Sequence, residues 1–196
     1  MRHKLLVVDT ETGGTDPLEH SLLSVAAVVW DGGLICGSIE LLIDEPCMRV
    51  TPEALAINGI DITSHKIQAL PTTVAVARLE EFIEEHFSDE VLRGEKVVLA
   101  GHNVAFDVGF IKRLYRLAGM NYDRILSHRT LDTASILRFL TLAGIRAARE
   151  ADSSSAFTEL KVAVAPAARH TALGDAVATA TLLNRLVDLV QARDPC

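Results

Sequence analysis

Two carboxylates stand one residue apart near the start of the chain. The segment 4–14 reads KLLVVDTETGG, so an aliphatic run leads directly into Asp9 and Glu11. Side chains at positions i and i+2 of a β-strand point to the same side, so both carboxylates should face the same way. Two unpaired acids held together resist ionising unless a positive charge lies between them, and a metal ion would supply that charge. A lone D-x-E pair is also common among solvated turn residues, so the rest of the chain must decide between the two interpretations.

Two further segments place carboxylates beside apolar elements. AGHNVAFDVGF joins a buried strand to a helix, and its Asp107 lies one helical turn after Asn103 in an apolar stretch where an acid needs a partner. RHTALGDAVATA begins an alanine-rich helix and contains His170 and Asp175. His170 and Asp175 are five positions apart, which corresponds to about 140° around a helix axis, so the two side chains would not share a face if both residues were helical. His170 should therefore come from the loop or the first turn. As plain structural alternatives, His102 and Asn103 could cap a helix, and His170 could be a cap or a surface residue.

A single explanation covers all three segments. Asp9, Glu11, Asp107 and Asp175 could converge on two divalent cations, an arrangement used for phosphoryl transfer in which one ion activates a water and the other steadies the leaving oxygen. Ligand sets made of oxygen favour Mg²⁺ or Mn²⁺ over zinc. His170 would then take the proton from the attacking water.

The elements that must position these residues alternate between strands and helices. Strands are predicted at 3–9, 22–30, 34–43, 96–101 and 129–133, with a turn at 31–33 between the second and third. Helices are predicted at 52–58, after Pro71, and at 104–118, 133–142, 157–164 and 171–191, with a loop at 144–155. A hairpin followed by alternating strands and helices indicates an α/β domain with a mixed sheet.

The composition excludes several classes of protein. Hydrophobic residues make up 49% of the 196 positions and charged residues 23%, which is typical of a globular domain with a sizeable core. No apolar run approaches the ~20 residues of a membrane helix, and the first residues show no signal-peptide pattern, so we expect a cytoplasmic protein without a membrane partner. The three cysteines, Cys36, Cys47 and Cys196, are widely spaced and suggest neither a disulfide framework nor a thiolate metal site.

The net charge of −7 is unevenly distributed along the chain. Residues 1–92 carry a net charge of −11, residues 93–149 carry +6, and residues 150–196 carry −2. The middle stretch contains six basic residues that could meet phosphates: Lys112, Arg113, Arg116, Arg124, Arg129 and Arg138. Solvated helix faces would give much the same count, so both interpretations stay open.

Three of these motifs resemble those of a known family. DTET at 9–12, HNVAFD at 102–107 and HTALGDA at 170–176 are similar, in order and spacing, to the three motifs of the DEDDh 3′–5′ exonucleases. That family includes the epsilon proofreading subunit of bacterial DNA polymerase III, ribonuclease T and oligoribonuclease. INGI at 57–60 and LDT at 131–133 extend the resemblance to nearly the whole chain. The resemblance implies a ribonuclease H-like fold, with a five-stranded mixed sheet flanked by helices.

The resemblance also implies a role for each matching acid and for the histidine. Asp9, Glu11 and Asp175 would bind the catalytic metal. Asp9 would bridge to a second metal, which Asp107 would support through water. His170 would be the general base.

The same resemblance implies four residues in substrate binding. Thr10 and Thr12 lie where the family holds the 3′-terminal nucleotide, and Asn103 matches the amide of the second motif. Asn58 stands where the proofreading subunit has a histidine near the terminal base, and Gly13 stands where the family more often has threonine. These two departures leave open how this chain would hold the last base.

The resulting hypothesis is a metal-dependent 3′–5′ exonuclease that occupies residues 1–196 as one domain. It would release nucleoside 5′-monophosphates from the 3′ end of single-stranded DNA or RNA, with two Mg²⁺ or Mn²⁺ ions as cofactors. The chain ends soon after Asp175, without the tail by which the epsilon subunit grips its polymerase, which favours a free-standing enzyme.

Two alternatives remain at this point. A catalytically silent nucleic-acid-binding or adaptor domain would be expected to lack at least one of the five proposed catalytic residues, all of which are present. A phosphodiesterase acting on a small nucleotide is favoured if the arginine-rich middle stretch lies away from the site. The choice between DNA and RNA stays open, and so does the oligomeric state, with a homodimer as one alternative.

Overall fold

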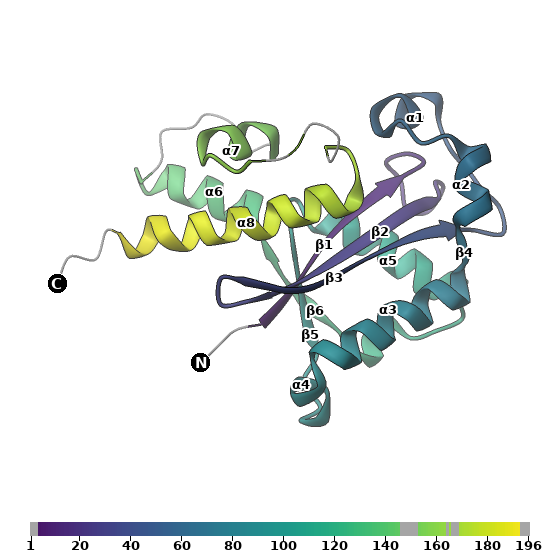
Figure 1. Cartoon of the computed structure of the whole chain (residues 1–196), viewed down its shortest axis with the longest axis horizontal. Coiled ribbons are helices and arrows are strands. Elements are labelled where there is room, and N and C mark those ends of the chain that lie inside the picture. Colours follow the sequence, from purple (N-terminus) through teal and green to yellow (C-terminus); the bar gives the residue numbers. More distant parts are fainter. Residues whose placement is uncertain (1–3, 146–152, 164, 166–168, 193–196) are drawn as a thin grey trace.

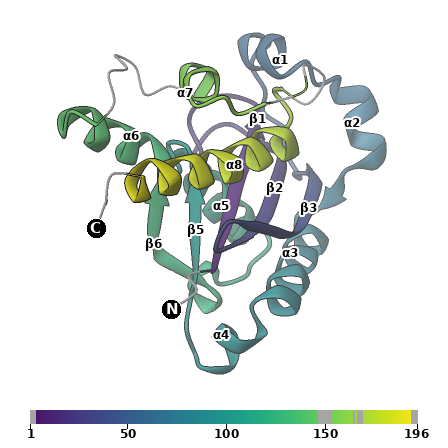
Figure 2. The ribbon, with the colours of Figure 1, turned by 60° about the vertical axis from the view of Figure 1, so that its left-hand side comes forward.

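One mixed β-sheet organises the part of the chain that the computed structural model describes, which is residues 4–145, 153–163, 165 and 169–192. Its strands are β1 (Lys4–Thr12), β2 (Leu22–Asp31), β3 (Leu34–Asp44), β4 (Leu70–Pro71), β5 (Val97–Gly101) and β6 (Leu126–Asp132). Their spatial order is β4-β3-β2-β1-β5-β6. β2 pairs antiparallel with β1 and β3, whereas β5 is parallel to β1 and β6 is parallel to β5. The sheet is therefore mixed, and β1 lies inside it between β2 and β5 (Figure 2).

Helices cover both faces of this sheet. They are α1 (Pro52–Asn58), α2 (Ile62–Gln68), α3 (Thr72–His86), α4 (Ser88–Leu92), α5 (Ala105–Leu117), α6 (Thr133–Leu142), α7 (Ser153–Glu159) and α8 (Ala172–Gln191), with a short 3₁₀ helix at Tyr122–Arg124. α3 and α5 lie on one face, and the long α8 crosses the other (Figure 1). α6 and α7 pack against α8.

The alternation of side chains along β1 separates two cores. Leu6 and Val8 are buried in the cluster that contains residues of α3 and α5. Val7 points the other way, into a cluster with Ala172, Ala176 and other residues of α8. Alanine side chains let a helix lie close to a sheet, so the N-terminal part of α8 sits directly over β1.

Most of the predicted elements are confirmed. The strands at 22–30, 34–43 and 96–101 agree with β2, β3 and β5 to within a residue or two, and the helix at 133–142 agrees with α6. The turn between β2 and β3 uses Gly32 and Gly33, which have positive φ angles of 56° and 104°. The α/β class with a mixed sheet is therefore confirmed.

The structure corrects the sheet in three places. The prediction of five strands is wrong, because the two-residue β4 pairs in parallel with the end of β3 and makes a sixth. β1 continues to Thr12, so the first pair of acids lies inside the strand rather than beyond its end. β6 begins at Leu126, three residues before the predicted strand at 129–133. A strand of two residues has no periodicity that a sequence pattern could reveal.

The helical predictions need corrections of the same kind. α2 and α4 were not predicted, because seven and five residues show too little of an amphipathic period. α7 covers Ser153–Glu159 instead of 157–164. The predicted loop at 144–155 lies in part outside the described residues. Within the described residues, no helix combines the length and the apolar character needed to cross a membrane.

Candidate active site

Three carboxylates from two elements meet at the carboxyl end of β1. Asp9 and Glu11 alternate with Val7 on β1, so they project from the sheet face that α8 covers. Asp175 lies in the first turn of α8, the part that sits over this strand. One carboxylate oxygen from each of the three residues lies within 4.8 Å of the other two. Strand alternation and the close approach of α8 thus bring these acids together.

Asp107 reaches the same region from the opposite face. It lies in the first turn of α5 and is only 5% exposed. Its Oδ1 accepts a 2.8 Å hydrogen bond from the hydroxyl of Thr10. Thr10 lies between Asp9 and Glu11 on β1, so its side chain projects from the opposite face of the sheet. Asp107 is not one of the three residues whose oxygens lie within 4.8 Å of one another. Its negative charge nevertheless raises the pKa of both Asp9 and Glu11.

Burial and mutual repulsion make these acids hard to ionise. Burial raises the pKa of Asp9 well above its usual range, and the charges of the neighbouring acids raise it further. Burial, followed by the charges of Asp175 and Asp107, raises the pKa of Glu11 to about 7. Burial also raises the pKa of Asp107, although the hydrogen bond from Thr10 opposes that shift. A cation among these groups would relieve their repulsion.

The donor set indicates which cation would fit. The three clustered residues offer carboxylate oxygens, which are the ligands preferred by hard cations such as Mg²⁺ and Mn²⁺. Neither of the described cysteines, Cys36 and Cys47, belongs to the cluster, and both are exposed. An acidic cluster able to hold a divalent cation is therefore present.

His170 lies where the helix carrying Asp175 begins. It is exposed, stands in the turn before α8, and has a left-handed backbone with a φ of 59°. The N-cap of α8 is Thr171, whose hydroxyl accepts a 3.1 Å hydrogen bond from the backbone N–H of Gly174. Thr171 rather than His170 therefore caps this helix, so the capping alternative is wrong, whereas the exposure of His170 agrees with the alternative of a surface residue. His170 lies in the turn before the helix, as the helical spacing predicted.

A pocket of about 360 Å³ opens beside Glu11. Its lining comes from the β1–β2 loop, from α1 and from α5: Glu11, Thr12, Gly14, Thr15, His20, Thr51, Glu53, Ala54, Ile57, Asn58 and Phe106. Asn58 is fixed in this lining because its side-chain amide donates a 3.2 Å hydrogen bond to the carbonyl of Thr12. The pocket thus joins one end of the carboxylate cluster to α1.

The four predicted substrate residues divide into two groups. Thr12 and Asn58 line the pocket, as a contact with a terminal nucleotide would require. The hydroxyl of Thr10 is instead engaged with Asp107. Asn103 is exposed in the turn after β5, with a φ of 62°, and its backbone N–H donates a 2.7 Å hydrogen bond to Oδ1 of Asp132. Thr10 and Asn103 are not among the residues that line this pocket.

Several lining residues were not predicted from the sequence. Phe106 packs on the core and against Phe110, yet it is half-buried and lines the pocket as well. His20 lies in a loop, and Glu53 lies in α1, whose helix was predicted but whose place beside the pocket was not. The one available signal was the position of Phe106 directly before Asp107, since neighbours of a site residue often share its cavity.

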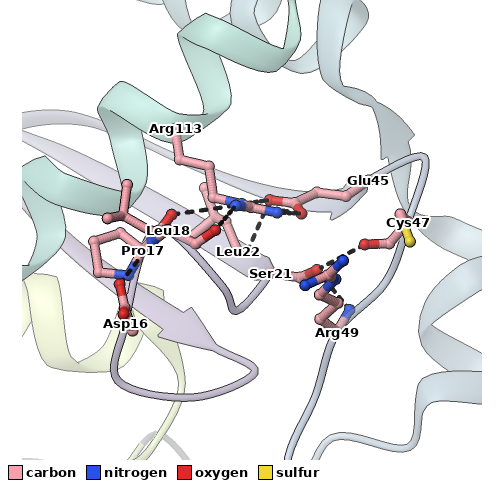
Figure 3. A network of polar contacts seen from close by, with 9 residues as sticks. All are labelled: Asp16, Pro17, Leu18, Ser21, Leu22, Glu45, Cys47, Arg49 and Arg113. Atoms are coloured by element: carbon pink, nitrogen blue, oxygen red, sulfur yellow. Dashed lines mark hydrogen bonds and ion pairs between the residues drawn. The ribbon is translucent and has the colours of Figure 1, made fainter.

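A buried ion pair holds the loop that forms one wall of the pocket. Arg113 on α5 donates to both carboxylate oxygens of Glu45, just after β3, at distances of 2.9–3.2 Å (Figure 3). The same guanidinium donates to the carbonyls of Pro17 and Leu18 in the β1–β2 loop. Glu45 also accepts a 3.0 Å hydrogen bond from the backbone N–H of Leu22. The loop that carries Gly14, Thr15 and His20 is thereby tied to α5.

Part of the basic middle stretch is engaged away from the carboxylates. Arg113 is committed to Glu45, and Arg124 pairs with Glu80 and Glu84 of α3. Arg124 precedes β6, so it lies at the end of the parallel strands opposite to the acids. Arg124 thus supports the fold, and Arg113 supports the loop that forms a wall of the pocket.

Comparisons with known proteins identify the fold. Exonuclease I of E. coli, in a crystal structure with a dA16 oligonucleotide, superposes with a TM-score of 0.75 at 18% identity over 98% of this chain and 41% of that chain. Exonuclease I from Methylocaldum szegediense gives the same TM-score at 22% identity. The architecture is therefore the ribonuclease H-like fold of exonucleases.

Comparisons of sequence identify relatives over most of the chain. An epsilon-like protein of DNA polymerase III from Rhodobacter capsulatus is 32% identical over 96% of this chain and 24% of its own length. Ribonuclease T from Shewanella frigidimarina is 29% identical over 67% of this chain and 61% of its own length. The chain thus spans about a quarter of the first relative and about three fifths of the second.

The fold is that of the exonucleases named above, and the acidic cluster could hold a divalent cation. The model of the exonuclease family RNase_T matches residues 6–183, which is most of the chain. The protein belongs to this exonuclease family. The family resemblance drawn from the three motifs is confirmed.

Proposed function

We propose that this protein is a metal-dependent 3′–5′ exonuclease that releases nucleoside 5′-monophosphates from the 3′ end of single-stranded nucleic acid. One observation carries the proposal: oxygens of Asp9, Glu11 and Asp175 lie within 4.8 Å of one another, and Glu11 also lines a pocket open to a ligand. The cluster offers a place for a cation, and the pocket offers a place for the end of a strand.

The proposed roles are those that the family resemblance implies, and the clustering of Asp9, Glu11 and Asp175 supports them. Asp9, Glu11 and Asp175 would hold one divalent cation, and Asp107 would support a second. Two bound Mg²⁺ or Mn²⁺ ions would supply an activated water and a counter-charge for the leaving oxygen. His170 accepts the proton of that water, which suits its exposed position in the turn before α8.

The bond changes in the reaction balance without a further reactant. The oxygen of water attacks the terminal phosphorus, and the bond between that phosphorus and the 3′ oxygen of the preceding nucleotide breaks. The preceding nucleotide keeps a 3′-hydroxyl, and the released nucleotide carries a 5′-phosphate. One water proton passes to His170 and from there to solvent, and the departing 3′ oxygen takes up a proton from solvent, so that one water is consumed for each bond cleaved.

The pocket beside Glu11 is the proposed position of the terminal nucleotide. Its apolar surface from Ile57 and Phe106 could stack on a base, and Asn58 and Thr12 supply polar groups nearby. We keep Thr10 and Asn103 as residues that position the site, through Asp107 and Asp132 respectively. The oligonucleotide complexes of Exonuclease I support a single-stranded substrate for this chain as well.

We further propose that residues 1–196 act as one exonuclease domain. The family match over 6–183 supports this, since it includes all five proposed catalytic residues. A homodimer remains a separate hypothesis, which sedimentation of the purified protein would test.

A second candidate function is hydrolysis of a small nucleotide by the same residues. Arg124 is paired with Glu80 and Glu84 at the opposite end of the sheet, so it cannot guide the body of a long strand into the site. A silent adaptor domain is less well supported, because Asp9, Glu11 and Asp175 are not only present but brought together.

End-labelled substrates test these functions together. Single- and double-stranded DNA and RNA oligonucleotides with a 5′ label should give a descending ladder with Mg²⁺ or Mn²⁺. Dinucleotides should be cleaved more slowly than oligonucleotides. Internal cuts would contradict the exonuclease proposal, and exclusive cleavage of dinucleotides would favour the small-nucleotide alternative.

A further inference from the structure

An arginine already contacts the carboxylate cluster. Nη1 of Arg169 lies 2.8 Å from Oδ1 of Asp175, and the two side chains are 21% and 17% exposed. Asp175 is one of the three residues whose oxygens lie within 4.8 Å of one another. The guanidinium therefore occupies an oxygen of a proposed metal ligand, which a divalent cation would also approach.

The charge of Arg169 acts on more than its direct partner. It lowers the pKa of Asp9, against burial and the charges of the neighbouring acids, which raise it. A guanidinium carries one positive charge, whereas a bound divalent cation carries two. Arg169 thus compensates part of the negative charge of the cluster and leaves the rest uncompensated.

Arg169 also contacts an aromatic ring. Its guanidinium carbon lies 5.2 Å from the centre of the ring of Phe157 on α7, and Phe157 is 4% exposed. The guanidinium can therefore leave Asp175 and still rest against an aromatic ring. The guanidinium thus has two contacts, one with Asp175 and one with Phe157, and it could keep the second when another cation displaces it from the first.

We propose that Arg169 is an internal counter-ion of the carboxylate cluster, which a divalent cation must displace from Asp175 on binding. This inference rests on the metal site of the proposed function. His170 directly follows Arg169, so displacement of the guanidinium links metal binding to the placement of the proposed general base. Arg169 touches neither substrate nor reacting atoms in this account and is a positioning residue.

The proposal predicts tighter metal binding when the arginine is removed. Arg169→Gln removes the competing cation and leaves more repulsion for the metal to relieve. The dissociation constant for Mn²⁺ should fall about tenfold, which corresponds to ~1.4 kcal/mol. Arg169→Lys keeps the charge but loses the planar guanidinium, so its effect should be smaller and in the same direction.

Titration calorimetry of the full chain with Mn²⁺ alone measures this directly. Arg185→Gln is the matched control, because Arg185 lies on α8, is about half exposed and pairs only weakly with Asp188 at 3.9 Å. It changes the net charge by the same amount without touching the cluster. A tenfold tighter constant in Arg169→Gln, with wild-type binding in Arg185→Gln, supports the proposal.

The contrary outcomes separate this inference from the proposed function. An unchanged or weaker constant in folded Arg169→Gln overturns the counter-ion role while the metal site stands. If Arg169→Gln does not fold, Arg169→Lys decides: a lower constant supports the role, and an unchanged or higher one overturns it. If the folded wild type binds no Mn²⁺ at all, the proposed function fails and this inference falls with it.

Discussion

The hydroxyl of Thr10 donates a 2.8 Å hydrogen bond to Oδ1 of Asp107, which joins β1 to α5 beside the three clustered carboxylates. The two residues are 97 positions apart in the chain. The bond favours the ionised form of Asp107 and lowers its pKa, whereas burial raises it. Thr10 therefore helps to keep a buried acid available for a cation.

Replacing this hydroxyl should move the pH profile of activity. Thr10→Val removes the hydrogen bond, so the pKa of Asp107 rises further and more of it is protonated near pH 7. The acid limb of the rate profile should shift to higher pH, with activity recovered in alkaline buffer. Thr130→Val, at an exposed position on β6, is the control. Equal profiles for Thr10→Val and wild type would exclude this role.

Without divalent cations, stability should fall as the pH rises. Glu11 ionises near its ordinary value of 4.5 in the unfolded chain and near about 7 in the folded protein. Between these values the folded state binds more protons, so the free energy of unfolding decreases as pH increases. Asp9 and Asp107, whose pKa values are also raised, act in the same direction. Melts from pH 5 to pH 8 with a chelator should show the decline, and saturating Mn²⁺ should reduce it.

Neutralising one acid should stabilise the metal-free protein while removing its response to metal. Asp175→Asn relieves repulsion within the cluster, but Arg169 then loses its charged partner, so Asp9→Asn is the cleaner test. It should raise the free energy of unfolding by about 1 kcal/mol in chelator at pH 8 and abolish most of the stabilisation by Mn²⁺. Asp188→Asn, an exposed acid on α8, should change neither quantity. A normal Mn²⁺ shift in Asp9→Asn would argue against the metal site.

His170 and Thr171 should separate catalysis from capping. His170→Asn keeps a residue that tolerates the left-handed backbone, so it should lower turnover by about 10²–10⁴ with little change in stability. Thr171→Ala removes the hydroxyl that accepts from Gly174, so it should lower the free energy of unfolding by about 1 kcal/mol. Kinetics and melts at saturating Mn²⁺ measure both effects. Near-normal turnover in His170→Asn would remove His170 from the mechanism.

Breaking the buried ion pair in Figure 3 should loosen the pocket wall. Arg113→Ala leaves Glu45 buried without its partner, which should lower the free energy of unfolding by roughly 3–5 kcal/mol. The freed β1–β2 loop should also raise KM for oligonucleotides more than it lowers kcat. Arg116→Ala, at an exposed position on the same helix, is the control. If Arg113→Ala matched Arg116→Ala in both stability and KM, the loop would not depend on this pair.

The three clustered carboxylates could be predicted from the sequence, but the residues that surround them could not. The two-residue period of a strand sufficed to place Asp9 and Glu11 on one side, and an alanine-rich helix start sufficed to bring Asp175 near them. The partners of these acids could not be predicted, because the contacts of Thr10 with Asp107 and of Arg113 with Glu45 join distant segments whose packing no local pattern records. Long-range pairs depend on the tertiary arrangement alone.

Local sequence patterns also failed to predict the pocket and the short helices and strands. The pocket takes its walls from a loop, from a seven-residue helix and from a half-buried phenylalanine, none of which has a distinctive period. Phe106 looked like an ordinary core residue because burial on one side and exposure to a cavity on the other give the same apolar pattern. Its contact with the pocket depends on the position of α1, which no local pattern predicts.

Single-turnover release of a labelled 3′-terminal nucleotide tests the central claim most directly. A single-stranded oligonucleotide carrying the label in its last nucleotide is mixed with excess protein at saturating Mn²⁺, for wild type and for Asp9→Asn. The account predicts that wild type releases the label first as a nucleoside 5′-monophosphate, and that Asp9→Asn is slower by about 10²–10³, a usual loss when an electrostatic stabiliser is removed. Release of the label in longer fragments, or a wild-type rate in Asp9→Asn, would contradict it.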